Sequence, residues 1–414
     1  MNIAVYSHYF TPEIGAPSAR IYDLARQWLV KDHQVQVITC FPNHPTGQIY
    51  PGYRRQRYMH ETVDEIDVHR HWTYITPNKG IAKKTLGHIS YLPGALLFSN
   101  RHIAKPDVAI GTSPTFFAAM AAIAAGIQHK IPFVMEVRDL WPASFEDLGV
   151  LTNRQLLSLL EMLEMFLYRR ATRIVTVTEE FRRNLIDRGI QPEKVVTIYN
   201  GADVDYWQPQ DPSEELRRKL GLEGCFVVLY IGAHGISQAL STILASANQL
   251  YDHPDIHFLF VGEGAEKELL VRQAQERNMP NVHFHDPVSK HEVQQFYALA
   301  DVCLVPLRDI PLFKTFIPSK MFEIMAMGRP IVASLAGESA AILNRSGGAL
   351  VVEPENADEI TQAIIQLYQH PEQRQQMGEQ ARQFVIDNFA RSALAAKYLD
   401  VLNDAKQAYG QRNL

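Results

Sequence analysis

The chain has 414 residues and a formal net charge of −5, with 46% hydrophobic and 21% charged residues. This length exceeds what one hydrophobic core usually supports, so we expect two domains, and the composition excludes a wholly disordered chain. The chain also lacks the strongly basic balance that is typical of nucleic-acid-binding proteins. Its three cysteines, Cys40, Cys225 and Cys303, are too far apart in the sequence for a disulfide framework or a cysteine metal cage, which favours a reducing compartment.

The N-terminus and the apolar runs bear on localisation. The opening residues Met1–Tyr6 lack the basic and long apolar regions of a signal peptide. The longest nearly apolar run, residues 116–127, is far shorter than the roughly 20 residues needed to span a bilayer. We therefore expect a cytoplasmic protein, or one that is peripheral on the cytoplasmic membrane.

Short apolar runs alternate with longer helical patterns in the first half of the chain. This alternation is typical of βαβ units and a mostly parallel sheet. We predict helices over residues 18–29 and 153–170, and strands over residues 2–6, 35–40, 107–110, 133–137, 173–177 and 195–198.

The pattern restarts at residues 226–231, which are as apolar as the first strand. Residues 204–213 before it are rich in Pro, Asp and Gln, and we interpret them as an interdomain linker. We predict an α/β protein of two doubly wound, Rossmann-like domains facing a cleft, with the ligand site in that cleft. The expected domains are residues 1–203 and 214–390, followed by a C-terminal helix over 391–414 that packs back toward the first domain. In the second domain, further strands are expected over 256–261, 282–284, 302–305, 331–333 and 350–352.

Several well-known site patterns are missing. No Gly-x-Gly-x-x-Gly follows either first strand, and the Gly-x-x-x-x-Gly-Lys-Ser/Thr phosphate loop is absent, which argues against hydride transfer and ATP hydrolysis. We also find no carboxylate or histidine spacing typical of metal ligands, and no dedicated nucleophile. The sequence therefore predicts no metal and no cofactor.

A first positive signal lies at the start of the first helix. Gly15 permits a close backbone approach, and Ser18 is a plausible N-cap that leaves the helix N-terminus open to an anion. Arg20 places a cation in the first turn, where a bound phosphate would favour it. Alternatively, Arg20 lies on a solvated face or pairs with Asp23.

A second signal is the run from Lys314 to Pro330. We expect Ser319 to cap a short helix that carries Lys320 in its first turn and Glu323 one turn further. A cation for a diphosphate and a carboxylate for ribose hydroxyls would suit a nucleotide-sugar. The alternative is a surface salt bridge between Lys320 and Glu323.

Six short motifs, in order along both predicted domains, carry a family resemblance. With them, the chain resembles retaining GT-B glycosyltransferases of family 4 over nearly its whole length. Within that family it is similar to bacterial O-antigen and exopolysaccharide enzymes of the N-acetylfucosaminyltransferase type. The motifs are Tyr9–Gly15, Phe41–Gly47, Glu136–Pro142, Tyr199–Asp203, Val261–Gly264, and Pro318-Ser319-Lys320 leading to Glu323.

The resemblance implies a donor site mostly in the second domain. Glu323 matches the second glutamate of the family's Glu-x7-Glu motif and would hold the donor ribose. Gly15 and Ala16 would complete the phosphate site from the first domain. The other expected donor-binding residues are Arg20, Gly232, His234, Glu263, Lys314, Thr315, Ser319, Lys320 and Glu338, and the expected acceptor-side residues are Glu13, His44, Arg138, Asp139 and Trp141.

The sequence departs from the family pattern at several positions, among them Thr112-Ser113-Pro114, which replaces a histidine that is often found after the fourth strand of the first domain. Thr315 stands where the motif has its first glutamate, and Ala233 and Gln238 stand where an Arg and a Lys are usual. The diphosphate charge must then be met elsewhere, and we expect Lys320 to meet it, with Lys314 or Arg20 as helpers.

These residues imply a reaction. We expect retaining transfer of a sugar, favouring an N-acetylated or 6-deoxy sugar, from a nucleotide-diphosphate donor such as a UDP-sugar to a lipid-linked glycan in surface polysaccharide biosynthesis. The leaving phosphate itself would accept the acceptor's proton, with Lys320 and Glu323 at the donor and Asp139 orienting the acceptor. Asp139 could instead form a structural pair with Arg138. The departures at Thr315, Ala233 and Gln238 leave a catalytically weak GT-B scaffold that binds nucleotide or glycan as the alternative, with a GT-B epimerase as a lesser one.

Residues 77–105 carry five cations and no acid, interleaved with apolar residues. Such a patch suits the anionic inner face of a membrane, although Pro93-Gly94 is expected to interrupt any long helix there. Its cations are Lys79, Lys83, Lys84, Arg101 and Lys105.

Overall fold

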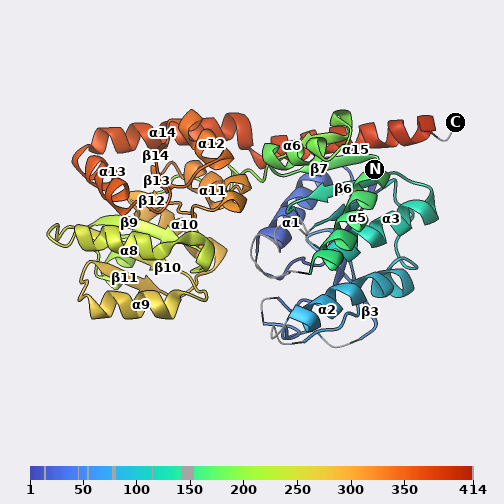
Figure 1. Cartoon of the computed structure of the whole chain (residues 1–414), viewed down its shortest axis with the longest axis horizontal. Helices are drawn as coiled ribbons and strands as arrows, with labels where there is room; N and C mark the ends of the chain where they lie inside the picture. Colours follow the sequence, from blue (N-terminus) through green and yellow to red (C-terminus); the bar gives the residue numbers. More distant parts are fainter. Residues whose placement is uncertain are drawn as a thin grey trace. The chain divides into compact units, whose positions relative to one another are not determined.

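The computed structural model describes residues 1–13, 15–44, 46–53, 56–76, 81–113, 115–140 and 153–412. The chain divides into two compact units, residues 1–200 with 391–414, and residues 201–390. Figure 1 shows that each unit is a β-sheet covered by helices, which confirms the predicted α/β architecture of two Rossmann-like domains. We describe each unit by itself.

The first unit contains an eight-stranded sheet in the order β3-β4-β2-β1-β5-β6-β7-β8. All neighbouring strands are parallel except β3 and β4. The strands are β1 (Asn2–Tyr6), β2 (Gln34–Cys40), β3 (Tyr58–Val63), β4 (Ile66–His71), β5 (Val108–Thr112), β6 (Phe133–Val137), β7 (Arg173–Thr176) and β8 (Val195–Thr197). The helices are α1 (Ala16–Leu29), α2 (Ile81–Gly94), η1 (Ala95–Ser99), α3 (Phe116–His129), α5 (Arg154–Arg170), α6 (Glu179–Asp187), η2 (Pro192–Lys194) and α15 (Arg391–Arg412).

The C-terminal helix α15 completes the core of the first unit, although it is the last element of the chain (Figure 1). Tyr398 lies fully buried with its ring edge-on to Trp28 at 5.3 Å, and Trp28 donates its indole N–H to the carbonyl of Ala395 at 3.2 Å. An ion pair between Arg391 and Asp23 joins the start of α15 to α1. This packing fixes α15 to the unit that begins the chain.

The second unit contains a six-stranded, wholly parallel sheet in the order β11-β10-β9-β12-β13-β14. Its strands are β9 (Phe226–Ile231), β10 (Ile256–Val261), β11 (Val282–His285), β12 (Val302–Leu304), β13 (Ile331–Ser334) and β14 (Ala349–Val352). Its helices are α7 (Glu214–Leu220), η3 (Ile236–Gln238), α8 (Leu240–Gln249), α9 (Lys267–Glu276), α10 (Lys290–Leu299), η4 (Pro311–Thr315), α11 (Lys320–Ala326), α12 (Glu338–Ser346), α13 (Ala357–Gln369) and α14 (Pro371–Phe389). In such a sheet, ligands bind beyond the carboxyl ends of the strands.

The predicted linker over residues 204–213 is corrected by the structure, which places these residues in the second unit. Trp207 is only 1% exposed and packs edge-on against Tyr297, and its carbonyl accepts a hydrogen bond from Arg382. The Pro- and Asp-rich composition did not indicate this packing, to which the bonds of Gln294 and Arg329 to the carbonyls of Tyr206 and Gln210 also contribute.

Two local expectations in the first unit are also corrected. Helix α1 begins at Ala16 with Gly15 before it, so Ser18 lies inside the helix and does not cap it. Pro93-Gly94 does not interrupt the segment after residue 81, because α2 runs through Pro93 to Gly94 and the π-helical turn η1 continues it. A local change of helical pitch is one of the ways in which a helix accommodates proline.

Candidate functional site

The loops at the carboxyl ends of β9 and β10 interlock through their backbones. The amide of His234 donates to the carbonyl of Glu263 at 2.9 Å, and Gly232 and Gly262 both have φ of 143°. A Cβ on Gly262 would lie 1.9 Å from the carbonyl oxygen of Gly232, and one on Gly264 would lie 2.3 Å from that of His234. Only glycine fits such contacts, so the sequence builds a narrow backbone platform at this edge of the sheet.

Lys320 extends from the first turn of α11 under this platform. Its ammonium donates to the carbonyl of Ile231 at 2.9 Å and lies 4.1 Å from the centre of the Tyr230 ring. Burial lowers the pKa of Lys320 to about 8, against an opposing effect of the Glu323 carboxylate. The amine is therefore mostly protonated at neutral pH, and it has donors left for an anion.

Glu323 lies one turn further along α11 beside two tyrosines. Its carboxylate accepts a hydrogen bond from the hydroxyl of Tyr297, and its charge also raises the pKa of Tyr206. The ammonium of Lys320 donates to the carbonyl of Ile231, and the nearby charge of Glu323 favours its protonated form, so the two side chains of α11 interact electrostatically. Sequence analysis missed Tyr206 and Tyr297, which no spacing connects to α11.

His234 lies fully buried among the rings of Tyr230, Phe260 and Phe284. Burial lowers its pKa to about 4, so the imidazole is neutral at pH 7. Neither ring nitrogen has a hydrogen-bond partner among the described residues. This position beneath the platform loops is consistent with a role in supporting them.

Glu263 lies on the outer rim of the same loops. Its carboxylate pairs with Lys267 at 3.2 Å, and Lys267 also pairs with Asp286 at 2.7 Å. Hydrogen bonding to Lys267 lowers the pKa of Glu263, which is therefore ionised at neutral pH. This network leaves Glu263 accessible from solvent.

The remaining donor candidates of the second unit surround the segment before α11. Lys314 pairs with Asp309 at 3.0 Å, and the hydroxyl of Thr315 donates to the carbonyl of Leu312 at 2.7 Å. A Cβ on Gly337 would lie 2.0 Å from the carbonyl oxygen of Lys314, so the loop before Glu338, the first residue of α12, contacts η4 directly. Ser319 immediately precedes α11, but its side chain does not cap the helix.

Arg20 is corrected most clearly by the structure. Its guanidinium is buried, forms an ion pair with Glu136 at 3.3 Å, and donates to the carbonyls of Ile198 and Tyr199 at 3.0 and 2.9 Å. A fourth bond reaches the side chain of Asn200 at 3.1 Å. Four of its five N–H donors are therefore used inside the first unit, where Arg20 has a structural role, and Asp23 pairs with Arg391 and not with Arg20.

Gly15 and Ala16 lie exposed at the start of the 14-residue helix α1. Gly15 has φ of 151°, and a Cβ there would meet only Pro17 at 3.7 Å. Pro17 has no N–H, and the amide of Ala19 already donates to the carbonyl of Gly15 at 3.0 Å, so this helix end offers fewer backbone donors to an anion than the sequence suggested.

The Glu13 side chain joins the loop after β1 to the loop after β2 by hydrogen bonds. Its buried carboxylate accepts hydrogen bonds from the backbone amides of Phe10, Asn43 and His44 at 3.2, 2.8 and 2.9 Å. Burial raises the pKa of Glu13, while these bonds and the nearby Arg70 oppose the shift. Glu13 therefore holds His44 in place, and it is a positioning residue.

The loop after β6 carries Arg138 and Asp139. Their backbone amides donate to the hydroxyl of Ser113 at 2.7 and 3.3 Å, which fixes the chain at the carboxyl end of the sheet. Burial lowers the pKa of Arg138 to about 10, and the nearby Glu136 opposes this shift. Trp141 lies outside the described residues.

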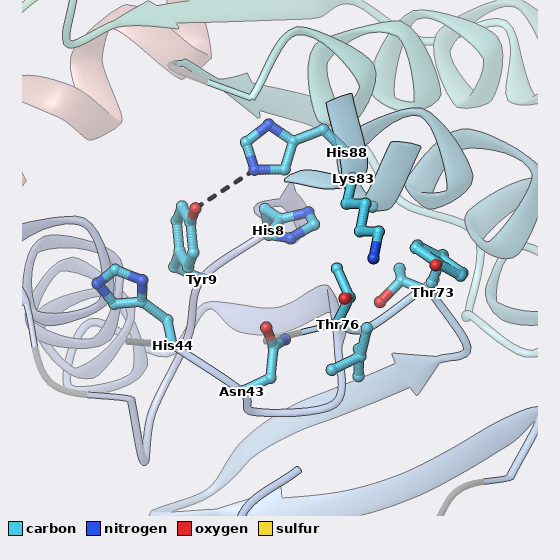
Figure 2. A pocket seen from close by; sticks show the side chains of 11 residues that line it. His8, Tyr9, Asn43, His44, Thr73, Thr76, Lys83 and His88 are labelled. Carbon is cyan, nitrogen blue, oxygen red and sulfur yellow. Dashed lines mark hydrogen bonds between the residues drawn. The ribbon is translucent and has the colours of Figure 1, made fainter. Parts of the chain in front are cut away.

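A pocket in the first unit collects the aromatic and polar residues after β1 and β2 (Figure 2). The hydroxyl of Tyr9 lies 3.5 Å from Nε2 of His88, and the ring of Tyr9 is edge-on to His44 at 5.1 Å. The free space is about 30 Å³, which suits one or two hydroxyl-sized groups. Among the lining residues, Tyr9, Asn43 and His44 belong to two of the sequence motifs and Lys83 belongs to the basic segment 77–105. The lining also includes His8, Thr73 and Thr76.

The described part of the chain contains neither a cluster of metal ligands nor a helix that could span a membrane. No group of three or more His, Cys, Asp or Glu side chains there lies close enough to hold a metal ion. None of the helices in those residues combines the length and the apolar character needed to cross a bilayer.

Comparisons with known proteins agree with this geometry. Residues 15–201 match the family described as "Glycosyl transferase 4-like domain", and residues 212–384 match "Glycosyl transferases group 1". The chain is 25% identical over 377 residues to WcaI of Escherichia coli (strain K12), covering 88% of this chain and 92% of that protein, whose name assigns it to glycosyl transfer in colanic acid biosynthesis.

Two solved structures share the fold. Sucrose-phosphate synthase from Thermosynechococcus elongatus superposes with a TM-score of 0.76 at 18% identity, covering 99% of this chain and 100% of the other. HepE of Anabaena, solved in complex with UDP and glucose, superposes with a TM-score of 0.72 at 17% identity over 97% and 99% of the two chains. These likenesses show the GT-B fold, and the two family matches, over residues 15–201 and 212–384, identify the chain as a glycosyltransferase whose first unit resembles the 4-like domain.

Proposed function

We propose that the protein transfers a sugar, with retention, from a nucleotide-diphosphate donor to a lipid-linked glycan during surface polysaccharide biosynthesis. The observation that carries this proposal is the ammonium of Lys320 beneath the Gly232 platform, with Glu323 one helical turn away. The donor nucleotide is proposed to be UDP, since HepE was solved with UDP and glucose. The name of WcaI supports the polysaccharide context. The N-acetylfucosaminyltransferase type remains part of this proposal on the sequence motifs alone.

Lys320 would stabilise the diphosphate that leaves the sugar. Charge develops on this leaving group as the glycosidic carbon gains oxocarbenium-like character, and a fixed cation in a poorly solvated position stabilises that charge strongly. Glu323 would accept the ribose hydroxyls, and the departing phosphate would take the proton of the acceptor hydroxyl. Asp139 is proposed to orient the acceptor from the first unit.

The reaction is proposed to need no metal ion, because the ammonium of Lys320 would neutralise charge on the diphosphate. Transfer measured with and without excess EDTA tests this point. Equal rates are expected, and activity that EDTA abolishes and Mg²⁺ or Mn²⁺ restores would overturn it.

A panel of UDP-, GDP- and dTDP-sugars tests the function itself. The expected result is thermal stabilisation by a UDP-sugar, together with slow hydrolysis of that donor and faster transfer when acceptor is added. Stabilisation without hydrolysis or transfer would favour the scaffold that binds nucleotide, for which Thr315 in place of the usual glutamate is the supporting observation.

The segment of α2 and η1 is proposed to meet the inner face of the membrane. Four large apolar side chains, Leu86, Ile89, Leu96 and Leu97, are exposed there, and Lys83, Arg101 and Lys105 lie in or near the segment. Lys79 lies outside the described residues. Exposed apolar groups flanked by cations are typical of surfaces that bind anionic lipid.

Sedimentation with anionic vesicles tests this contact. Because each basic residue near such a surface contributes about 1 kcal/mol, the triple variant Lys83→Glu/Arg101→Glu/Lys105→Glu should detach almost completely. The matched control Lys219→Glu/Arg272→Glu/Arg277→Glu makes the same change of net charge in the second unit. Equal binding of the two variants would leave α2 and η1 as a solvated basic face.

A further inference from the structure

A second cavity lies in the second unit, at the edge of the sheet opposite the Gly232 platform. It encloses about 380 Å³ and reaches the residues that precede β12 and β13, Asp301 and Pro330. Its volume falls within the range of small-molecule pockets, roughly 300–1,000 Å³. Three arginines line it, Arg329, Arg374 and Arg382, and we call it the arginine pocket.

The three guanidiniums are only partly used by the protein. Arg374 donates through Nη1 to the carbonyls of Leu367 and Tyr368, and Arg382 donates through Nη1 to those of Trp207 and Ala326. Among the described residues, no hydrogen bond is recorded for Nε or Nη2 of either side chain. Each guanidinium has five N–H donors, so both keep one edge of the fork for a ligand.

Arg329 adds a cation that the protein does not neutralise well. Its Nη1 donates to the carbonyl of Ala300 at 3.3 Å and its Nη2 to that of Gln210 at 3.4 Å, while its buried Nε has no hydrogen-bond partner among the described residues. Burial lowers the pKa of Arg329, because the charged form is poorly solvated there. A buried charge of this kind is stabilised by an added anion.

The two carboxylates of the pocket do not pair with these arginines. Asp301 accepts the amide of Val227 at 2.9 Å and lies 3.9 Å from Arg217, outside the cluster. Glu379 accepts the side-chain amide of Gln375 from the previous turn of α14 at 2.9 Å. Within the described residues, none of the three pocket arginines forms an ion pair within 4.0 Å, so their charge is left for a ligand.

We propose that the arginine pocket binds a small molecule that carries a phosphate group. A planar guanidinium fork matches two oxygens of a phosphate at once, and the pocket offers two such forks beside a third cation. The rest of the cavity leaves room for an organic part attached to the phosphate. In the competing explanation, the arginines serve only to cap the ends of α10, α11 and α13.

Exposed positions on α14 allow a test that spares the arginines and the helix ends. Gln375 and Glu379 line the pocket, so Gln375→Glu should repel an anion and Glu379→Gln should attract it. The control is Gln383→Glu, because Gln383 donates to Asp387 in the same i,i+4 arrangement at 2.8 Å but does not line the pocket. The melting temperature without ligand confirms that each variant folds.

The probe is inorganic pyrophosphate, titrated by calorimetry into the full chain carrying Lys320→Gln. This background removes the cation of the proposed donor site, so the result does not depend on the proposed function. We expect Gln375→Glu to weaken binding by about tenfold and Glu379→Gln to tighten it severalfold, with no change for Gln383→Glu. No binding in the Lys320→Gln background, or equal affinity of all three variants, would overturn the pocket and leave the arginines as helix caps.

Discussion

The ammonium nitrogen of Lys320 lies 2.9 Å from the carbonyl oxygen of Ile231, the last residue of β9. This contact fixes a buried cation at the carboxyl end of the sheet, directly beside Gly232. A Cβ on Gly232 would lie 2.6 Å from the same nitrogen. The absence of a side chain at position 232 and the presence of a lysine at 320 are thus two parts of one arrangement.

The first prediction concerns this arrangement. Gly232→Ala should weaken UDP affinity at least tenfold, because the new Cβ displaces the ammonium and residue 232 has φ of 143°. Calorimetry with UDP measures the change. Gly224→Ala is the control, since Gly224 also has positive φ, at 70°, but nothing within 4 Å of its Cβ. If both variants bind UDP as the wild type does, the close approach at Gly232 has no role in binding.

The second prediction is a pH dependence. The pKa of Lys320 is about 8 in the folded protein, below its ordinary value of 10.5. UDP affinity should therefore fall as pH rises above 8, by up to about tenfold per pH unit, because the neutral amine cannot neutralise the diphosphate. Lys320→Gln, measured over the same range, corrects for ionisation of the nucleotide and should lack this decline.

The free energy of unfolding should rise with pH over the range in which UDP affinity falls. Burial of the charged amine costs stability in full below pH 8, and this cost disappears between pH 8 and 10.5 as the folded protein loses the proton. The free energy of unfolding of the wild type, measured with urea, should therefore rise relative to that of Lys320→Gln between pH 8 and pH 10.5. Parallel curves for the two proteins would show that the lysine is not buried in solution.

The third prediction separates binding from folding at Glu323. Glu323→Gln should weaken UDP affinity while the melting temperature barely moves, because an amide is a poorer acceptor for ribose hydroxyls but can still accept from Tyr297. The exposed Glu276→Gln on α9 is the matched control. Unchanged affinity in Glu323→Gln would indicate a purely structural carboxylate.

The fourth prediction concerns Arg20, whose role is structural. Arg20→Met should destabilise the first unit by about 3–5 kcal/mol, because it leaves the buried Glu136 carboxylate without its principal partner. Urea unfolding measures this loss, and the double variant Arg20→Met/Glu136→Gln should recover part of it. Arg26 lies on the same helix as Arg20 and forms an exposed pair with Asp64 in the turn between β3 and β4. Arg26→Met should therefore destabilise the first unit by no more than about 1 kcal/mol. Similar losses at both positions would contradict the buried pair.

The strands could be predicted because parallel strands are buried on both faces and read as short apolar runs. The hairpin of β3 and β4 escaped this pattern, since β3 is half-exposed and polar, and its turn depends on Asp64 and Glu65 at φ of 47° and 67°. Such a turn favours Asn-Gly or Asp-Gly, so an Asp-Glu pair gives a weak signal. Local composition therefore predicted the buried parallel strands but not the half-exposed hairpin of β3 and β4 at the edge of the sheet.

Lys320 and Glu323 could be placed near each other from the sequence, because both lie on one short helix. Prediction failed where partners come from distant segments. Arg20 pairs with Glu136 and donates to the carbonyl of Ile198, and both partners lie more than a hundred residues away in the sequence. Hydrophobic periodicity cannot predict contacts between such distant residues. Tyr297 on α10 likewise reaches Glu323 on α11 across a long stretch of sequence.

The split first unit has a consequence for biosynthesis. Its core needs Leu394, Tyr398 and Leu402 of α15, which are synthesised only after the whole 201–390 unit. Since domains form as their residues leave the ribosome, the unit translated second can finish first, while the unit begun first waits for the last 24 residues. A premature stop at codon 391 would therefore spare the later domain and leave the earlier one with an open hydrophobic face, so a quality-control protease should digest the N-terminal half of such a product first.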